Sequence, residues 1–289
     1  MYNYYEQYHS WMLNKQEQLS SAASIIKVAH LENVSLSELY LIEESMRKFN
    51  YAIYQVDNSL KFSADSLNAF AMQFGLTKLD SHLCSTEDKL TKLSDCQGDA
   101  NALYIPYTNR AINWHTDGYY NLPDQQILSL ILHCQQPASS GGENEFLDHE
   151  QVFIHLMNTE PDYISALIKD DVMTIPENRQ QGLLHRPEVT TSIFQILNKN
   201  HDVLMRYSQR KKNISFKQDT LTQEAIACLN EFINSEAAPK ITIKLKAGQG
   251  ILANNVLHKR TAFKDKEGLE RVYYRARYYE RLKIELKIN

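Results

Sequence analysis

The chain has 289 residues, of which 43% are hydrophobic and 23% are charged, and its formal net charge is -4. This length allows one large domain or two small ones with a well-buried core. The charge excludes the strongly basic surface that is typical of nucleic-acid-binding proteins. No apolar stretch is long enough to span a membrane, and the first residues do not resemble a signal peptide, so we expect no membrane partner.

The cysteine pattern indicates a reducing compartment. The four cysteines, Cys84, Cys96, Cys134 and Cys228, form no C-x-x-C pair and have no regular spacing. This spacing argues against a zinc knuckle and against a disulfide framework. We therefore expect free thiols and a cytoplasmic protein.

The first hundred residues combine helix and strand patterns. Residues 1–20 are aromatic and polar and predict a helix or an arm packed on the body of the protein. Apolar residues recur at helical spacing over residues 35–50, and residues 51–56 predict a short strand. A second helix is predicted over residues 63–74, which Gly75 ends.

The middle of the chain begins with a nearly continuous apolar run over residues 126–135, which predicts a buried strand. The S-S-G-G stretch at residues 139–142 predicts a turn. Helical patterns follow over residues 148–156 and 161–169, and again over residues 222–234.

Period-two alternation dominates the C-terminal part. It appears over residues 240–248, continues after a G-Q-G turn as a strand-like run over residues 250–258, and returns over residues 271–280. Helices followed by strands predict an antiparallel β core with helices packed outside. The glycine-rich motifs of nucleotide-binding folds are absent from the sequence.

Two candidate metal ligands, His115 and Asp117, lie one residue apart in the stretch N-W-H-T-D-G-Y-Y-N at residues 113–121. On a strand, residues at this spacing point to the same face, so both side chains reach one ion from one side. His258, which ends the run over residues 250–258, is the candidate third ligand. Two histidines and one carboxylate on one face of an octahedron form the iron(II) site of oxygenases. The alternative interpretation of His258 is a surface histidine.

Arginines share one face of the last predicted strand. Arg271, Arg275 and Arg277 alternate there with Val272, Tyr274 and other residues of the opposite face. Buried guanidinium groups without partners are costly, so the row indicates either a solvent-facing strand edge or a polar pocket for anions. Arginine binds carboxylates bidentately, so such a pocket suits a keto-acid cosubstrate and an acidic substrate.

The combined pattern resembles the taurine dioxygenase-like (TauD/TfdA) family. The H-T-D-G motif, the later His258 and two arginines four residues apart carry the resemblance, together with the P-A-S-S-G-G-E-N stretch that ends at Asn144. The resemblance covers residues 100–280. It implies a mainly β fold with flanking α-helices and a double-stranded β-helix (jelly-roll) core with a helical insert. It also implies a single domain over residues 1–289, in which residues 1–100 pack on the core.

The same resemblance implies an iron(II)- and 2-oxoglutarate-dependent dioxygenase. Such an enzyme uses dioxygen to oxidise a small anionic or amino-acid-like substrate and releases succinate and carbon dioxide. His115, Asp117 and His258 would hold the iron. Arg271 would bind the distal carboxylate of 2-oxoglutarate, and Arg275 would meet the anionic group of the substrate.

Three details refine this expectation. The family often has threonine where this chain has Asn144, whose amide can donate a similar hydrogen bond to the cosubstrate. The thirteen residues from His258 to Arg271 are slightly more than in the taurine enzyme, which argues against that substrate. Halogenating relatives lack the carboxylate that Asp117 supplies, so hydroxylation, desaturation or cyclisation is expected.

Two other classes of protein remain open from the sequence. A His-Asp-His site in a jelly-roll can bind zinc or manganese and support hydrolysis or isomerisation. A non-enzymatic β-sandwich binding module would have His115 and Asp117 as turn residues. The sequence also leaves open the roles of His185, Arg206 and Arg277, and whether the protein is a homo-oligomer, as family members often are.

Overall fold

The computed structural model describes residues 4–17, 23–57, 62–80, 90–96, 104–180, 182–197, 202–210 and 214–282. The chain divides into two compact units. The helical unit comprises Met1–Ser20, Asn113–Gln126 and Leu147–Lys240, and the sheet unit comprises Ser21–Ile112, Ile127–Phe146 and Ile241–Asn289. None of the described helices is long and apolar enough to cross a membrane.

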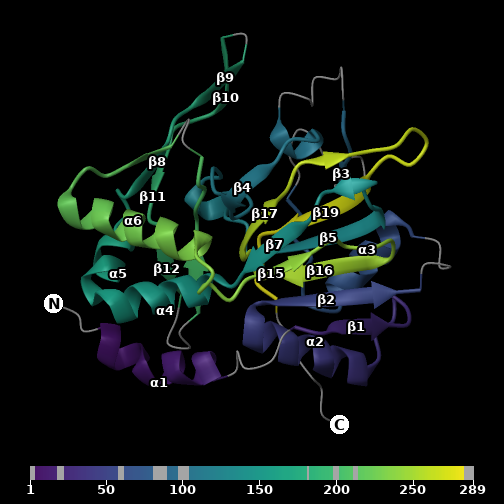
Figure 1. Ribbon diagram of the computed structural model, residues 1–289, viewed down its shortest axis with the longest axis horizontal. Coiled ribbons are helices and arrows are strands. Elements are labelled where there is room, and N and C mark those ends of the chain that lie inside the picture. Colours follow the sequence, from purple (N-terminus) through teal and green to yellow (C-terminus); the bar gives the residue numbers. More distant parts are fainter. Residues whose placement is uncertain are drawn as a thin grey trace. The chain divides into compact units, whose positions relative to one another are not determined.

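A six-stranded sheet with the order β1-β2-β16-β5-β19-β3 is the largest element of the sheet unit (Figure 1). Its strands are β1 (Ile25–Val28), β2 (Tyr51–Val56), β3 (Thr91–Leu93), β5 (Ser129–Gln136), β16 (Gln249–Ala253) and β19 (Val272–Tyr278). All neighbouring strands are antiparallel except β1 and β2. Leu132 of β5 pairs with Ile251 on one side and with Arg275 on the other, so β5 and β19 both lie inside the sheet.

A second sheet has the order β15-β7-β17-β4. Its strands are β4 (Ile112–His115), β7 (Asn144–Leu147), β15 (Ile241–Ile243) and β17 (Leu257–Arg260). A short two-stranded sheet joins β6 (Ser140–Gly141) and β18 (Phe263–Lys264). Strands β15, β16, β17 and β19 follow one another in the chain, apart from the short β18, and alternate between the two large sheets. This is the connectivity of a double-stranded β-helix, so the predicted fold class is confirmed.

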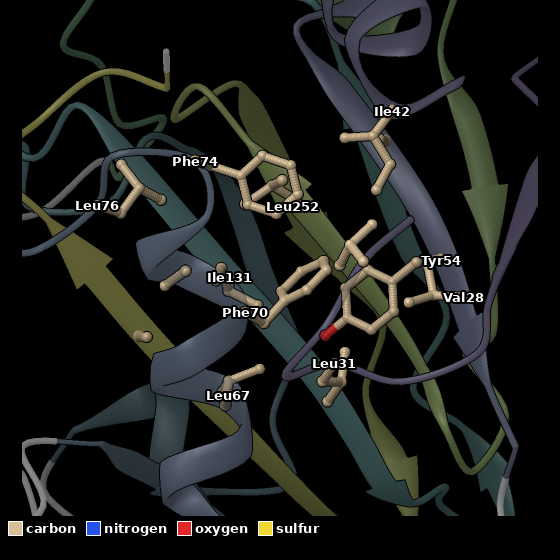
Figure 2. Close-up of a cluster of buried hydrophobic side chains, with 14 of the residues drawn as sticks. Val28, Leu31, Ile42, Tyr54, Leu67, Phe70, Phe74, Leu76, Ile131 and Leu252 are labelled. Atoms are coloured by element: carbon tan, nitrogen blue, oxygen red, sulfur yellow. The ribbon is translucent and has the colours of Figure 1, made fainter. Parts of the chain in front are cut away.

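Helices α2 (Leu36–Phe49) and α3 (Ala64–Met72) cover one face of the six-stranded sheet. Both begin after a serine whose side chain accepts a hydrogen bond from the third residue of the helix. Figure 2 shows Phe70 of α3 beside Tyr54 of β2, with Ile131 and Leu252 of the sheet in the same buried cluster. This apolar layer holds the sheet on the side away from its arginines.

The helical unit is built on α1 (Tyr4–Glu17), α4 (His149–Thr159), α5 (Pro161–Leu167) and α6 (Thr220–Asn234). In Figure 1, α4, α5 and α6 lie side by side, and the hairpin of β9 and β10 extends away from them. Short strands and turns complete the unit: β8 (Met173–Ile175), β9 (Asn178–Gln180), β10 (Leu183–Arg186), β11 (Val189–Thr191), β12 (Phe194–Ile196), β13 (Val203–Met205), β14 (Ser215–Phe216) and the 3-10 helix η4 (Pro123–Gln125). Lys15 of α1 ion-pairs with Asp148 and Glu150 at 2.9 and 2.7 Å.

Two predicted elements differ from the structure. The run over residues 250–258 is two strands in different sheets, because Asn255 has a positive φ of 46° and the chain turns there. The alternation over residues 240–248 forms a strand only at β15 (Ile241–Ile243). The segment before His115 contains the 3-10 helix η3 (Ile105–Tyr107) and then β4. Three of the cysteines, Cys96, Cys134 and Cys228, are free as expected, and Cys84 lies outside the described residues.

Candidate functional site

His115 and Asp117 lie at the end of β4 and just beyond it. The His115 Nε2 and Asp117 Oδ1 atoms are 3.8 Å apart, and the two side chains are 11% and 5% exposed. Asp117 is past the last strand residue, yet the one-residue spacing still brings both side chains to one side, as the sequence predicts. Gly118 then has a positive φ of 64°, which turns the chain away from the ligands.

The backbone around these two side chains is held by a neighbouring segment. The Thr116 amide donates to the Tyr207 carbonyl at 2.9 Å, and the Gln209 amide donates to the Trp114 carbonyl at 2.8 Å. Trp114 itself is buried, with 1% of its surface exposed. Residues 207–209 therefore fix the ligand segment from the side, a role that no periodicity in the sequence indicated.

His258 is the second residue of β17 rather than the end of a longer strand. Its Nδ1 lies 2.9 Å from the carbonyl oxygen of Val256, and the Nδ1 of His115 lies 2.9 Å from the carbonyl oxygen of Asn113. Because a carbonyl oxygen can only accept, each Nδ1 carries the hydrogen and each Nε2 presents a lone pair. Such a backbone contact fixes the tautomer and the ring orientation that a metal ligand needs.

One group of possible metal ligands emerges from the described residues, and it consists of His115, Asp117 and His258. The ligand atoms of the three side chains all lie within 4.8 Å of one another. Two neutral imidazoles and one carboxylate form the donor set of iron(II) oxygenases, which leaves the remaining coordination positions to cosubstrate and oxygen. The chemistry of the donors therefore fits iron(II).

Arg271 precedes β19 and is buried, with 1% of its surface exposed. Its guanidinium carbon lies 3.8 Å from the centre of the Tyr273 ring and 5.1 Å from that of Phe263. The Nε and Nη1 atoms have no hydrogen-bond partner among the described residues. Burial lowers the pKa of this guanidinium, with the nearby charges opposing the effect. A buried guanidinium whose nitrogens are not satisfied by the described residues can bind an added anion.

The other two arginines of the row are also buried. Arg275 and Arg277 are 9% and 3% exposed, so the interpretation of the row as a solvent-facing strand edge is wrong. The burial has a topological cause, because β19 lies between β5 and β3. Arg277 forms an ion pair with Asp80. Arg275 faces the same side of β19 as Arg277 and Tyr273.

Asn144 opens β7 and is 5% exposed. Its side-chain amide donates weakly to the Gly142 carbonyl at 3.4 Å. Asn144 shares a strand face with Phe146, whose ring centre is 6.1 Å from that of His258. The predicted turn before β7 is present, with positive φ at both Gly141 and Gly142.

Two residues that the sequence left without a role have different environments. His185 is exposed on β10. Arg206 is 1% exposed, and its side chain donates to the backbone carbonyl of Tyr119 at 3.0 Å. The sequence signal that marks Arg206 is weak, because a single arginine in an irregular segment gives no periodicity.

Comparison with known proteins identifies related sequences. The family model described as "Taurine catabolism dioxygenase TauD, TfdA family" matches residues 21–277. A protein named uridine-5'-phosphate dioxygenase from Streptomyces sp is 27% identical over 169 residues, which cover 55% of this chain and 58% of that protein. The chain thus spans little more than half the length of this relative.

Solved structures share the fold at low sequence identity. PvcB from Pseudomonas aeruginosa has a TM-score of 0.59 at 12% identity, covering 90% of this chain and 87% of its own. A taurine dioxygenase from Burkholderia xenovorans has a TM-score of 0.59 at 14% identity, covering 89% and 88%. An asparagine oxygenase, solved with Fe(II), 3-hydroxyasparagine and succinate, has a TM-score of 0.56 at 10% identity, covering 96% and 91%.

Proposed function

The chain belongs to the taurine catabolism dioxygenase TauD, TfdA family, and on this basis we propose which of its residues serve the reaction and what kind of substrate it takes. We infer that it is an iron(II)- and 2-oxoglutarate-dependent dioxygenase, which its membership of this family supports. The family favours this activity over the two other classes that the sequence left open, a zinc or manganese hydrolase or isomerase and a non-enzymatic binding module.

We propose that His115, Asp117 and His258 hold the iron. The support is the distance of at most 4.8 Å among their ligand atoms and the backbone contacts that orient both imidazoles. Bound iron and 2-oxoglutarate together supply oxidation by dioxygen, with 2-oxoglutarate leaving as succinate and carbon dioxide. The protein's part is to present three donors from one side and to leave room for the cosubstrate and for oxygen.

Arg271 is the proposed anchor for the distal carboxylate of 2-oxoglutarate. The observation that carries this assignment is a guanidinium that is 1% exposed, has two nitrogens without a partner and has no acid paired with it among the described residues. A carboxylate at one edge of the guanidinium would supply acceptors that the surrounding residues do not, because each edge of the fork matches two carboxylate oxygens. The Tyr273 ring lies against the face of the guanidinium and leaves the N–H groups in its plane to the carboxylate.

The proposed substrate is a small anionic or amino-acid-like molecule, and hydroxylation is the proposed outcome. Arg275 is assigned to the anionic group of the substrate, since it lies on the same strand face as Tyr273 and is 9% exposed. Asn144 is assigned a hydrogen bond to the cosubstrate through its amide. The names of uridine-5'-phosphate dioxygenase and asparagine oxygenase likewise refer to small polar molecules.

The test is an anaerobic titration of the protein with iron(II) and 2-oxoglutarate, read from the weak visible charge-transfer band of the chelate. Wild type should show the band, and His258→Ala should lose it. Arg271→Ala should weaken 2-oxoglutarate binding about 100-fold, since a charge-assisted bidentate contact is worth roughly 3 kcal/mol. Arg179→Ala is the control, because Arg179 pairs with Glu177 on the exposed hairpin. An undiminished band in Arg271→Ala would refute the anchor, and no band in wild type would refute the metal assignment.

A further inference from the structure

Two buried arginines outside the proposed anchor also form no ion pair within the described part of the chain. Arg206 is 1% exposed and Arg260 is 5% exposed, and neither forms an ion pair with a described carboxylate. In both side chains the Nε atom has no partner among the residues that the structure describes. The charge of a buried cation must be compensated by nearby dipoles or anions. In both arginines, backbone carbonyl groups supply this compensation.

The charge of Arg206 is compensated by backbone carbonyl groups of the turn that follows Asp117. Its Nη2 donates to the carbonyl oxygen of Tyr119 at 3.0 Å and also to that of Asn121. Its Nη1 lies 3.4 Å from the Thr191 hydroxyl. Burial lowers the pKa of Arg206 to about 10, so the group remains a cation at neutral pH.

Arg260 makes the same kind of contact on the other side of the ligand segment. Its Nη2 donates to the carbonyl oxygens of Thr108 and Arg110 at 2.7 and 2.5 Å. Its guanidinium carbon lies 4.8 Å from the centre of the Phe263 ring. Burial, followed by the charge of Arg271, lowers the pKa of Arg260 to about 9.

The two contacts have one geometry. In each, a single guanidinium nitrogen binds the carbonyl oxygens of residues i and i+2, which fixes a bend in the backbone. The bend at Arg110 ends five residues before His115, and the bend at Tyr119 begins two residues after Asp117. If either bend opened, a buried guanidinium would lose its compensating dipoles, so the contact resists opening more strongly than a neutral hydrogen bond.

We propose that Arg206 and Arg260 are positioning residues that clamp the two ends of the segment carrying His115 and Asp117 and so preset these ligands for the metal. The proposal rests on the proposed function, because it takes His115 and Asp117 as ligands. Supporting contacts of this kind typically change metal affinity 10- to 100-fold when they are removed. Lysine cannot replace arginine fully, since a rotating ammonium lacks the planar fork that fixes direction.

The test measures the binding of Co(II), used as a probe in place of iron(II), by its visible absorption and by calorimetry. Arg206→Met and Arg260→Met keep an unbranched apolar stem and remove the guanidinium, and we expect each to weaken Co(II) binding 10- to 100-fold. Arg206→Lys and Arg260→Lys should recover part of this loss. The Co(II) absorption should also broaden or shift in the methionine variants, which a general loss of stability would not cause.

Arg277→Met is the matched control. Arg277 lies on β19 and is similarly buried, but it is paired with Asp80. Replacing Arg277 should therefore lower stability and leave Co(II) affinity within twofold of wild type. Thr191→Val keeps the Arg206 charge, loosens only its Nη1 contact and should weaken Co(II) binding a few-fold. It tests the clamp even if Arg206→Met does not fold.

The outcomes separate the two proposals. If wild type and His258→Ala bind Co(II) equally, the metal assignment is wrong. If His258→Ala loses Co(II) but the methionine, lysine and Thr191→Val variants all bind as wild type does, the clamp is wrong and the metal assignment stands.

Discussion

Arg271 and Arg277, at the two ends of the arginine row, differ in the partners of their side chains. Arg277 is paired with Asp80, and the hydroxyl of Tyr279 contacts the same carboxylate, so this arginine is part of the core. Arg271 forms no ion pair with a carboxylate of the described residues, and the rings of Phe263 and Tyr273 lie against its guanidinium. The two residues have the same charge and similar burial, and they differ in what surrounds the guanidinium.

Removal of the carboxylate from Asp80 should therefore be costly. In Asp80→Asn the buried Arg277 keeps its charge and loses the opposite charge that compensates it. We expect the free energy of unfolding to fall by about 3–5 kcal/mol, measured by urea denaturation. The double variant Asp80→Asn/Arg277→Met should recover part of this loss, because it no longer holds an unpaired charge.

The control for this prediction is the exposed pair of Arg179 and Glu177, in which both side chains are about half exposed. Glu177→Ala should leave the unfolding curve unchanged, since water screens such a pair. Equal stability of Asp80→Asn and wild type would contradict the structural role of the Asp80–Arg277 pair.

At the scale of elements, the pairing of β2 with β16 depends on one glycine. Gly250 is opposite Tyr54, and a Cβ atom at Gly250 would lie 2.2 Å from the Tyr54 ring. Tyr54 is fully buried, its ring centre is 4.9 Å from that of Phe70, and its hydroxyl hydrogen-bonds with His133 at 3.1 Å. The ring has no open space to move into, so the absence of a side chain at Gly250 sets the register of these strands.

We expect Gly250→Ala to destabilise the protein by about 1–3 kcal/mol, as overpacking of a core does. Thermal and urea unfolding measure this loss. The double variant Gly250→Ala/Tyr54→Leu should be less destabilised than the sum of the two single changes, because leucine leaves room for the added methyl group. Additive effects would show that the alanine does not press on Tyr54.

Local patterns predicted the elements around this pairing well. Helices α2 and α3 lie within the predicted ranges and β2 has the predicted bounds, because helix and strand periodicity depend on neighbouring residues alone. The break at Asn255 was missed. Its positive φ is stabilised by a hydrogen bond from its side chain to the Ile127 carbonyl, 128 residues away, and such a partner is invisible in a local window.

At the scale of the whole molecule, the stability of the protein should depend on pH through the core residue His133. Its side chain is 2% exposed, and burial lowers its pKa to about 4. The unfolded chain binds a proton near pH 6.5, whereas the folded protein does not until about pH 4. Stability contributed by neutral His133 is therefore complete above pH 6.5 and decreases as the pH falls between these values.

As the pH falls through that window, we expect protonation of His133 to lower the free energy of unfolding by about 1.4 kcal/mol per pH unit, and by roughly 3 kcal/mol in total. The measurement is urea unfolding of the metal-free protein at pH 7, 6, 5 and 4.5. His133→Gln, which keeps a polar partner for Tyr54 without a titrating group, should show a slope that is smaller by one proton. Parallel profiles for the two proteins would argue against a neutral buried His133.

By itself, the sequence indicated the family and its jelly-roll fold, because the motifs that carry the resemblance are short local stretches of the chain. It also placed Arg271, Arg275 and Arg277 on one face of a strand. Only the tertiary structure decided that this face is buried, that Asp80 neutralises Arg277, and that Arg206 binds the turn after Asp117. These are pairings between residues tens to hundreds of positions apart, and the burial that gives them their strength exists only after the chain has folded.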